Sequence, residues 1–499
     1  MKEKNKYNLE KQHKKGKLHA IERISRILDS DTFCELGSGI GAYKEEYNAG
    51  SLYVYDGVIT GYGYINGKLV YIYSQDFTIC GGTVGKKHGE KIVSTIKKAL
   101  ENKCPIIGIN DSGGARIQEG VNALAAYGDI FYYNTLASGY IPQISVILGP
   151  CAGGAVYSPG ITDFVFMVDE ISHMFVTGPK VIEEVTGVSC NEDELGSTYI
   201  HKNFSGVSHF VTSSEESCFQ KLRKLISIIP SSAVEIKNIN MKYSKKFFTN
   251  IHNIVPRNPR KVYNINDIIS EIVDLNEFIE VQKEFAPNIV VGFGKISEIT
   301  VGIVANQPNI MAGVLDCDSS DKAARFVRYC DAFNIPIVTL VDVPGFMPSI
   351  EQEKKGIIRH GAKLLYAYAE ATTIKITIIL RKAFGGAYIA MGSKHLGADR
   401  VYAWPQSQIS VMGAEGAVNV IYSRQLKMLA GREREEYKTE KIKEYEKIYM
   451  SSLVAEREGY IDEIIEPKET RTQIFKDILS LQNKQNLFYI LKKHGNIPL

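Results

Sequence analysis

A repeat of about 230 residues constrains this chain more than any other feature of its sequence. Gly61 recurs as Gly292 (292 − 61 = 231), and Gly153 recurs as Gly385 (385 − 153 = 232). Two copies of one fold bring the same backbone feature to a pair of sites. The repeated features are glycine pairs after buried strands, which points to chemistry carried out by backbone amides. The matched positions are Gly61/Gly63 with Gly292/Gly294, Pro105/Asp111 with Pro336/Asp342, and Gly153/Gly154 with Gly385/Gly386.

The pattern within each copy predicts an α/β fold. Residues 58–65 and 68–74 read as two strands joined at Asn66-Gly67, a pair that favours the positive φ angles of a tight hairpin turn. Each hairpin precedes two helix–strand pairs, and repeated strand–strand–helix units build stacked sheets flanked by helices in a superhelical arrangement. The expected helices are 90–101, 120–137, 321–333 and 357–369, and the expected further strands are 106–110, 144–148, 289–296, 300–306, 337–341 and 374–380.

A polar, proline-containing stretch at residues 251–263 interrupts this pattern. Such a composition is typical of a linker. We therefore expect two domains, residues 1–257 and 258–499. The last part of the chain is charged and reads as helical.

The composition excludes several classes of function. The formal net charge is +3, with 44% apolar and 23% charged residues, so nothing indicates binding to nucleic acid or to a membrane surface. No apolar run reaches the ~18 residues that a membrane span needs. The eight cysteines form no C-x-x-C pair, which favours free thiols and a cytoplasmic location. The histidines lack metal-ligand spacing, so no metal site is expected.

Two glycine loops are the best candidates for chemistry. The first is G-P-C-A-G-G-A, residues 149–155, and the second is K-A-F-G-G-A-Y, residues 382–388. Each lies between a buried strand and a segment with helical spacing. Glycines let a ligand oxygen approach the unpaired amides of a helix N-terminus, and two such amides form an oxyanion hole. Glycine can also serve close packing alone, but the same loop in both copies favours the functional interpretation.

Other catalytic motifs are absent or weak. G-S-G-I-G-A at residues 37–42 fits the dinucleotide pattern, but no amphipathic helix follows it, and a simple loop is the better interpretation. Neither a phosphate-binding G-x-x-x-x-G-K-[S/T] loop nor a G-x-S-x-G elbow occurs. No conventional general base can be identified.

At these loops the chain resembles the carboxyltransferase subunits of biotin-dependent acyl-CoA carboxylases, including propionyl-CoA carboxylase beta subunits. The resemblance covers roughly residues 18 to 465. Its motifs are D-S-G-G-A-R-I-Q-E-G (111–120), D-V-P-G-F (342–346), G-I-I-R-H-G-A-K-L-L-Y-A-Y (356–368), A-F-G-G-A-Y (383–388), M-G-S-K-H-L-G-A-D (391–399) and V-M-G-A-E-G-A-V (411–418).

The resemblance implies two crotonase-like domains per chain, here residues 1–257 and 258–499, and a homohexamer. Its active sites would lie where the N-terminal domain of one chain meets the C-terminal domain of another. It implies an acyl-CoA substrate, whose α-proton passes to N1 of biotin. Gly153 and Gly154 would hold the thioester oxygen, and Gly386 and Ala387 the biotin ureido oxygen.

Further substrate contacts are expected around these loops. Arg116 and the Lys86-Lys87 pair follow glycine-rich turns, where a cation would suit the phosphates of CoA. Ile389 stands where propionyl-preferring relatives often have aspartate, and it would shape the acyl pocket. The full set of expected substrate-binding residues is Gly113, Gly114, Ala115, Arg116, Gly385 and Ile389.

The chain departs from the complete enzymes in what it lacks. It has no A-M-K-M biotinylation sequence and no ATP-binding carboxylase segment. The biotin would therefore be attached to a separate biotin carboxyl carrier protein and carboxylated by a separate biotin carboxylase.

Three alternatives stay open. An alpha subunit of a malonyl- or methylmalonyl-CoA decarboxylase, or a transcarboxylase, would run the same chemistry in reverse. A crotonase-type hydratase or isomerase needs a carboxylate base beside its oxyanion hole, and no Asp or Glu follows either glycine pair within eight positions. A non-catalytic CoA-binding scaffold would have no use for a second glycine pair.

Overall fold

The computed structural model describes residues 9–14, 16–41, 54–235, 251–259, 261–484 and 493–499. The chain divides into two compact units, Met1–Ile236 and Lys237–Leu499. Among the described residues, no helix is long and apolar enough to span a membrane.

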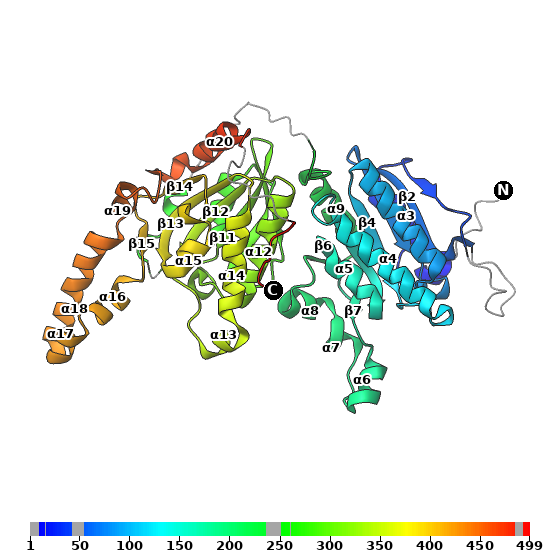
Figure 1. The fold of residues 1–499 in the computed structure, drawn as a ribbon, viewed down its shortest axis with the longest axis horizontal. Helices are drawn as coiled ribbons and strands as arrows, with labels where there is room; N and C mark the ends of the chain where they lie inside the picture. Colours follow the sequence, from blue (N-terminus) through cyan, green and yellow to red (C-terminus); the bar gives the residue numbers. More distant parts are fainter. Residues whose placement is uncertain (1–8, 15, 42–53, 236–250, 260, 485–492) are drawn as a thin grey trace. The chain divides into compact units, whose positions relative to one another are not determined.

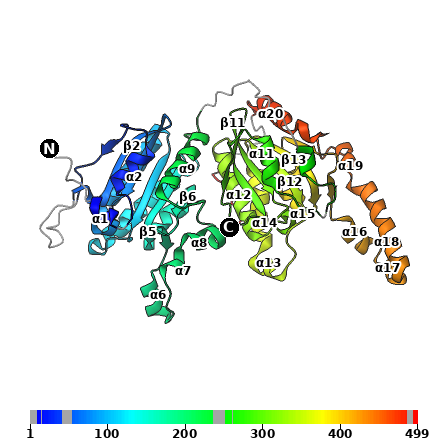
Figure 2. The ribbon, with the colours of Figure 1, turned by 180° about the vertical axis from the view of Figure 1, so that it is seen from behind.

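A mixed sheet forms the centre of the first unit, in the order β1-β2-β3-β4-β5-β6-β8, with β7 paired to β5. The strands from β1 to β3 are antiparallel, and the pairings from β3 onward are parallel. Helices α3 and α4 cover one face (Figure 1), and α2 and α9 cover the other (Figure 2). The strands are β1 (Cys34–Leu36), β2 (Val58–Ile65), β3 (Lys68–Gln75), β4 (Ile106–Ser112), β5 (Gln143–Ala152), β6 (Phe164–Val168), β7 (His173–Phe175) and β8 (Phe210–Thr212). The helices are α1 (Leu9–His13), α2 (Ala20–Ile27), α3 (Lys86–Asn102), α4 (Val121–Ala137), α5 (Tyr157–Ile161), α6 (Pro179–Thr186), α7 (Glu192–Gly196), α8 (Thr198–Ile200) and α9 (Glu215–Ile228).

The second unit repeats this topology. Its sheet has the order β9-β10-β11-β12-β13-β14-β16, with β15 paired to β13. Helices α12 and α14 lie on one face (Figure 1), and α11 and α20 lie on the other (Figure 2). The strands are β9 (Ile279–Val281), β10 (Ile289–Ile296), β11 (Ile299–Asn306), β12 (Ile337–Val343), β13 (Lys375–Phe384), β14 (Arg400–Ala403), β15 (Gln408–Ser410) and β16 (Glu463–Ile464). The helices are α10 (Ile251–Ile254), α11 (Ile265–Ile272), α12 (Cys317–Ala332), α13 (Ile350–Lys355), α14 (Ile357–Glu370), α15 (Gly385–Ala390), α16 (Ala414–Ile421), α17 (Ser423–Met428), α18 (Gly431–Tyr445), α19 (Ser452–Arg457) and α20 (Thr470–Leu481).

The first repeated glycine pair belongs to strand packing. Gly61 on β2 faces β1, and a Cβ there would overlap the carbonyl oxygen of Cys34. Gly292 on β10 has the same relation to the carbonyl oxygen of Ile279 on β9. Both glycines therefore permit a close approach of antiparallel strands.

The predicted hairpin turn is confirmed, since Asn66 and Gly67 have φ angles of 51° and 77°. Several expected boundaries are wrong: helix α3 begins at Lys86, four residues before its expected start, and α12 and two strands also differ. Helix α12 begins at Cys317, and its first turn is closed by a capping box at Asp316. Strands β5 and β13 run on to Ala152 and Phe384, because β7 and β15 pair with the segments that the sequence assigned to loops.

The stretch taken for a linker contributes to the second unit. Ile251 and Val255 are buried in a cluster with Ile268 and Ile474. The boundary between the two compact units accordingly falls before residue 251, between Ile236 and Lys237. The assignment of two family domains to residues 1–257 and 258–499 stays a prediction.

Candidate active site

The two glycine loops begin with the same backbone conformation at their first glycine. In the first unit β5 ends at Ala152, and the chain turns into the 3-10 helix η5 (Gly153–Val156) and then α5. In the second unit β13 ends at Phe384, and α15 begins at Gly385. Gly153 and Gly385 have φ angles of 64° and 62°, in the left-handed region that favours glycine.

Each loop presents backbone amides at the start of a helix. The first N–H groups of a helix have no acceptor within it, and they lie at the positive end of its dipole. A Cβ at Gly154 would lie 3.5 Å from the ring of Tyr127, and one at Gly386 would lie 3.9 Å from the ring of Phe346. An aromatic ring therefore flanks each loop without filling it.

The shared conformation fixes how the two loops correspond. Since Gly153 matches Gly385, the residues that match Gly386 and Ala387 are Gly154 and Ala155. The family resemblance predicts Gly153 with Gly154 as donors in one loop and Gly386 with Ala387 in the other. Ala155 is thus a candidate donor that it missed, although the constant repeat spacing contained the signal.

The D-S-G-G-A-R segment supports the first loop. Gly113 donates its N–H to the carbonyl oxygen of Gly81 (3.0 Å), and Val84 donates to the carbonyl oxygen of Gly114 (2.9 Å). Gly114 has a φ angle of 102°, and Ala115 forms a parallel bridge with Val84. Gly113 is exposed, whereas Gly114 is buried.

Arg116, which was expected to contact the phosphates of CoA, lies in a buried environment with two carboxylates. Its side chain is buried and pairs with Asp56 (2.7 Å) and Glu119 (2.9 Å). Burial acts to lower the pKa of Arg116, but Asp56 and then Glu119 hold it above its usual value. This environment favours a structural role. Lys86 and Lys87 are exposed at the N-terminus of α3, and Lys87 contacts Glu90 (2.8 Å).

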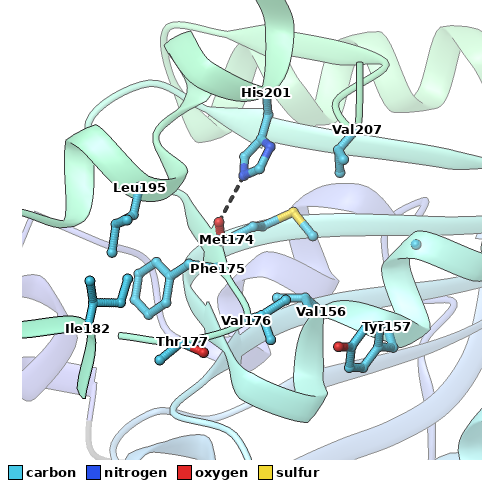
Figure 3. A pocket seen from close by; sticks show the side chains of 11 residues that line it. Val156, Tyr157, Met174, Phe175, Val176, Thr177, Ile182, Leu195, His201 and Val207 are labelled. Carbon is cyan, nitrogen blue, oxygen red and sulfur yellow. Dashed lines mark hydrogen bonds between the residues drawn. The ribbon is translucent and has the colours of Figure 1, made fainter. Parts of the chain in front are cut away.

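An apolar cavity of about 490 Å³ lies beside the first loop (Figure 3). Val156 and Tyr157, which follow directly after the loop, form part of its wall. Its other walls come from β7 and the segments after it. The lining residues are Val156, Tyr157, Gly160, Met174, Phe175, Val176, Thr177, Ile182, Leu195, His201 and Val207.

This cavity offers no available base. None of its lining residues is Asp or Glu. His201 Nε2 lies 2.8 Å from the carbonyl oxygen of Met174 (Figure 3), and its Nδ1 lies 2.7 Å from Ser205 Oγ. Since a carbonyl can only accept, Nε2 carries the proton and Nδ1 accepts from the Ser205 hydroxyl. Burial lowers the pKa of His201, so the ring is neutral with both nitrogens engaged.

In the second unit, Ile389 follows the loop by one helical turn. It lies on α15, and 38% of it is exposed. Residues three and four apart share a helix face, so Ile389 lies on the same face as Gly385 and Gly386. Among the described residues, no group of three His, Cys, Asp or Glu side chains is placed to hold a metal ion.

Comparison with known proteins now identifies the family. The carboxyl transferase domain matches residues 11–497 of the chain. The chain belongs to the carboxyl transferase family. Members of this family move a carboxyl group between biotin and an acyl-CoA, and the expected enzyme class is confirmed.

This carboxyltransferase has close relatives along its whole length. It is 48% identical over 491 residues to the propionyl-CoA carboxylase carboxyltransferase subunit of Haloferax mediterranei, covering 98% of this chain and 95% of the relative. It is 46% identical over 507 residues to the methylmalonyl-CoA decarboxylase subunit alpha of Propionigenium modestum, with the same two shares covered.

A solved structure of transcarboxylase 12S matches this carboxyltransferase with a TM-score of 0.92 and 45% identity, covering 98% of this chain and 94% of that one. That structure is described as a hexamer assembly with methylmalonyl-CoA bound. The predicted crotonase-like fold class is confirmed.

Proposed function

We propose that this chain is the carboxyltransferase component that moves a carboxyl group between carboxybiotin, attached to a carrier protein, and the α-carbon of a short-chain acyl-CoA. The observation that carries the proposal is the pair of matched loops, Gly153–Ala155 and Gly385–Ala387. A reaction with two carbonyl-type oxygens that gain negative charge needs two sets of amide donors. A hydratase or isomerase needs only one set.

The first loop would bind the thioester. Removal of the α-proton places negative charge on the thioester oxygen, and fixed amide donors stabilise that charge without having to reorganise. The donors are the N–H groups of Gly154 with Gly153 or Ala155. The apolar cavity beside the loop would hold the acyl chain and exclude water. Its lack of a carboxylate argues against a crotonase-type hydratase.

The second loop would bind the biotin ureido oxygen through the N–H groups of Gly386 and Ala387. The residues present fit that group, because the loop is open at Gly386, where a Cβ would meet only the ring of Phe346 at 3.9 Å, and because both N–H groups lie in the first turn of α15. Bound biotin supplies the nitrogen that carries the carboxyl group and accepts the α-proton. In the carboxylation direction an α-C–H bond and the N–C bond to the carboxyl group break, while a C–C bond and an N–H bond form.

The partners follow from this assignment. We propose that a biotin carboxyl carrier protein brings the biotin and that a biotin carboxylase loads it. The chain would act as a homohexamer in the cytoplasm, with each site built from domains of two chains. The proposal covers carboxylation and its reverse, as in a decarboxylase alpha subunit, because relatives of the two kinds match at 48% and 46% identity. Ile389 would form one wall of the acyl pocket, which stays a prediction.

The test is a turnover assay of the purified chain with malonyl-, methylmalonyl- and ethylmalonyl-CoA, with and without free biotin. We expect decarboxylation that depends on biotin and that ATP does not stimulate. Chromatography of the CoA esters measures it. The three esters give the acyl preference as a ratio of kcat/KM values.

Crotonyl-CoA serves as the comparison substrate. Hydration of crotonyl-CoA, together with no biotin-dependent turnover of any malonyl-type ester, would replace this proposal with the hydratase. ATP-dependent fixation of bicarbonate by the chain alone would contradict the separation of the carboxylase and carrier functions.

A further inference from the structure

Each glycine loop lies next to a buried aspartate on the neighbouring strand. Asp111 lies near the end of β4 and Asp342 near the end of β12, and both are fully buried. β4 pairs with β5, and β12 pairs with β13, and β5 and β13 are the strands that lead into the loops. Each aspartate contacts an arginine at 2.9 Å.

In the second unit the carboxylate is bound by the loop-bearing strand itself. Arg381 Nε donates to Asp342 Oδ2 (2.9 Å), and the Lys382 N–H donates to Oδ1 (3.1 Å). Both donors lie on β13 just before Gly385. Burial raises the pKa of Asp342, and Arg381 and Lys382 oppose that rise. The carboxylate thus fixes the end of β13 from which the second loop starts.

In the first unit the same positions hold Gly149 and Pro150. Proline has no N–H to donate, and Asp111 Oδ1 has no hydrogen-bond partner among the described residues. A Cβ at Gly149 would overlap Asp111 Oδ1, so a larger residue there would displace the carboxylate. The strand that carries the first loop therefore cannot supply the cation.

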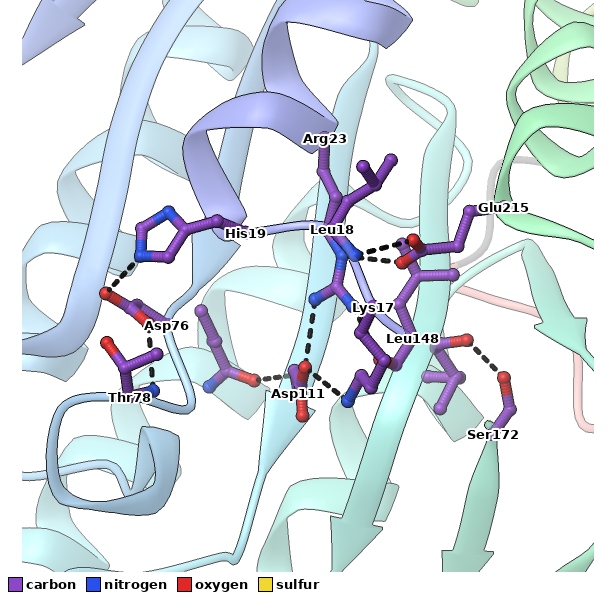
Figure 4. A network of polar contacts seen from close by, with 12 residues as sticks. Lys17, Leu18, His19, Arg23, Asp76, Thr78, Asp111, Leu148, Ser172 and Glu215 are labelled. Carbon is purple, nitrogen blue, oxygen red and sulfur yellow. Dashed lines mark hydrogen bonds and ion pairs between the residues drawn. The ribbon is translucent and has the colours of Figure 1, made fainter. Parts of the chain in front are cut away.

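The cations come from the N-terminal segment instead (Figure 4). Arg23 on α2 donates to Asp111 Oδ2 (2.9 Å), and Lys17 contacts the same oxygen (2.8 Å). Arg23 also donates to the carbonyl oxygen of Leu148 on β5 (2.8 Å) and to Glu215 (2.8 Å). One guanidinium thereby joins the aspartate on β4 to Leu148 on β5, four residues before that strand ends at Ala152.

We infer that Asp111 and Asp342 are positioning residues, each for the glycine loop on the neighbouring strand, and that they are held by different parts of the chain. Residues 17–23 hold the first loop from outside the sheet, whereas β13 holds the second loop from within. This inference rests on the proposed function, in which the first loop binds the acyl-CoA thioester and the second binds biotin. We call the cations that hold Asp111 the first anchor and those that hold Asp342 the second anchor. A change in one anchor should then affect the use of one substrate and not of the other.

The test compares two variants that weaken one anchor each. Lys17→Met removes one cation from Asp111 and leaves Arg23 in place. Arg381→Lys keeps a charge but loses the guanidinium fork, whose Nε donates to Asp342 and whose Nη1 donates to the carbonyl oxygens of Asn258 and Lys261. Initial rates of methylmalonyl-CoA decarboxylation are measured while the CoA ester and free biotin are varied independently.

We expect Lys17→Met to lower kcat/KM for the CoA ester by about tenfold and to leave the KM for biotin unchanged. A displacement of the first loop by 1 Å would cost about 10²-fold in rate, and loss of one of two cations should displace it by less than that. Arg381→Lys should raise the KM for biotin and leave the KM for the ester unchanged. Pro150→Ala, added to Lys17→Met, supplies the N–H that Lys382 provides in the second unit. It should restore most of the lost kcat/KM.

Thermal melting and light scattering establish that each variant folds and assembles like the wild type. The inference is wrong if each variant changes kcat/KM for the CoA ester and for biotin by the same factor. It is also wrong if Pro150→Ala does not restore kcat/KM for the CoA ester, because the ion pairs of Asp111 and Asp342 are then merely structural. Failure of the proposed function would show differently, as wild-type protein without any biotin-dependent turnover.

Discussion

At the scale of single residues, the second glycine of each loop decides what the loop can bind. Gly154 and Gly386 have room for a Cβ against an aromatic ring at 3.5 Å and 3.9 Å. A single methyl group there is in ordinary contact. A β-branched side chain adds two methyl groups beyond that Cβ, and in the proposed function they would compete with the substrate oxygen for space at the loop.

We expect Gly154→Val to reduce carboxyl transfer by about 10²–10³-fold, the usual cost of losing one oxyanion donor. The loss should appear in kcat, because the amides act on charge that develops in the transition state. Steady-state decarboxylation with free biotin measures it. Gly154→Ala is the control, since its Cβ fits and the protein should fold and assemble normally.

Near-normal turnover of a folded Gly154→Val protein would contradict the assignment of the first loop. The matched variant Gly386→Val should fail with biotin while it still binds the CoA ester, and calorimetry can measure that binding.

At the scale of elements, a buried lysine joins a helix to the hairpin beneath it in each unit. Lys91 on α3 donates to the carbonyl oxygens of Tyr55 and Val58. Lys322 on α12 donates to those of Gln282, Phe285, Ala286 and Ile289. Each lysine thus binds backbone carbonyl oxygens at the first residue of β2 or β10 and in the segment just before it.

Lys322 should make stability depend on pH. Burial lowers its pKa to about 7, opposed by Glu280 and Glu284. In the unfolded chain the group titrates near ~10.4, so between these values the unfolded state binds more protons. Stability contributed by this group therefore rises with pH above 7, by at most ~1.4 kcal/mol per pH unit.

Lys322→Met should remove that slope. Urea unfolding of both proteins at several values between pH 7 and pH 9 gives the difference in free energy of unfolding. The exposed Lys354→Met is the control and should leave the slope as in the wild type. If the difference in free energy of unfolding between the wild type and Lys322→Met does not change with pH, Lys322 keeps its proton in the folded state and the prediction is wrong.

At the scale of the whole molecule, one face of α4 exposes large apolar side chains to water in the single chain. Val121, Leu124, Tyr132 and Leu136 are 75%, 64%, 60% and 50% exposed. Contiguous exposed apolar surface of this kind marks an interaction site. The proposed homohexamer would cover it.

Light scattering should therefore give the mass of six chains for the wild type, and Leu124→Glu should shift it to smaller species. A glutamate in an apolar contact is buried without a partner, which costs several kcal/mol. Ser25→Glu, on α2 over the other face of the same sheet, should leave the mass unchanged. A wild-type monomer would contradict the assembly.

Much of this molecule could be predicted from its sequence. The repeat spacing revealed the duplicated sheet, the paired hairpins and the glycine loops, because apolar periodicity and glycine at positive φ are local signals. The buried ion pairs could not be predicted, because Arg116 and Asp56 or Arg23 and Asp111 lie 60 and 88 residues apart. The true ends of β5 and β13 depend on pairing with β7 and β15, whose residues lie 23 (173 − 150) and 26 (408 − 382) positions further along the chain.

Gly149 also limits the order in which this chain can accept mutations. An arginine at position 149, as at position 381 in the other copy, would overlap Asp111 while Arg23 and Lys17 are present. Loss of Arg23 first would leave a buried carboxylate with one remaining cation, and breaking a buried pair costs about 3–5 kcal/mol. The cation for Asp111 can therefore move to position 149 only if the Asp111 carboxylate also moves and Arg23 is replaced at the same time.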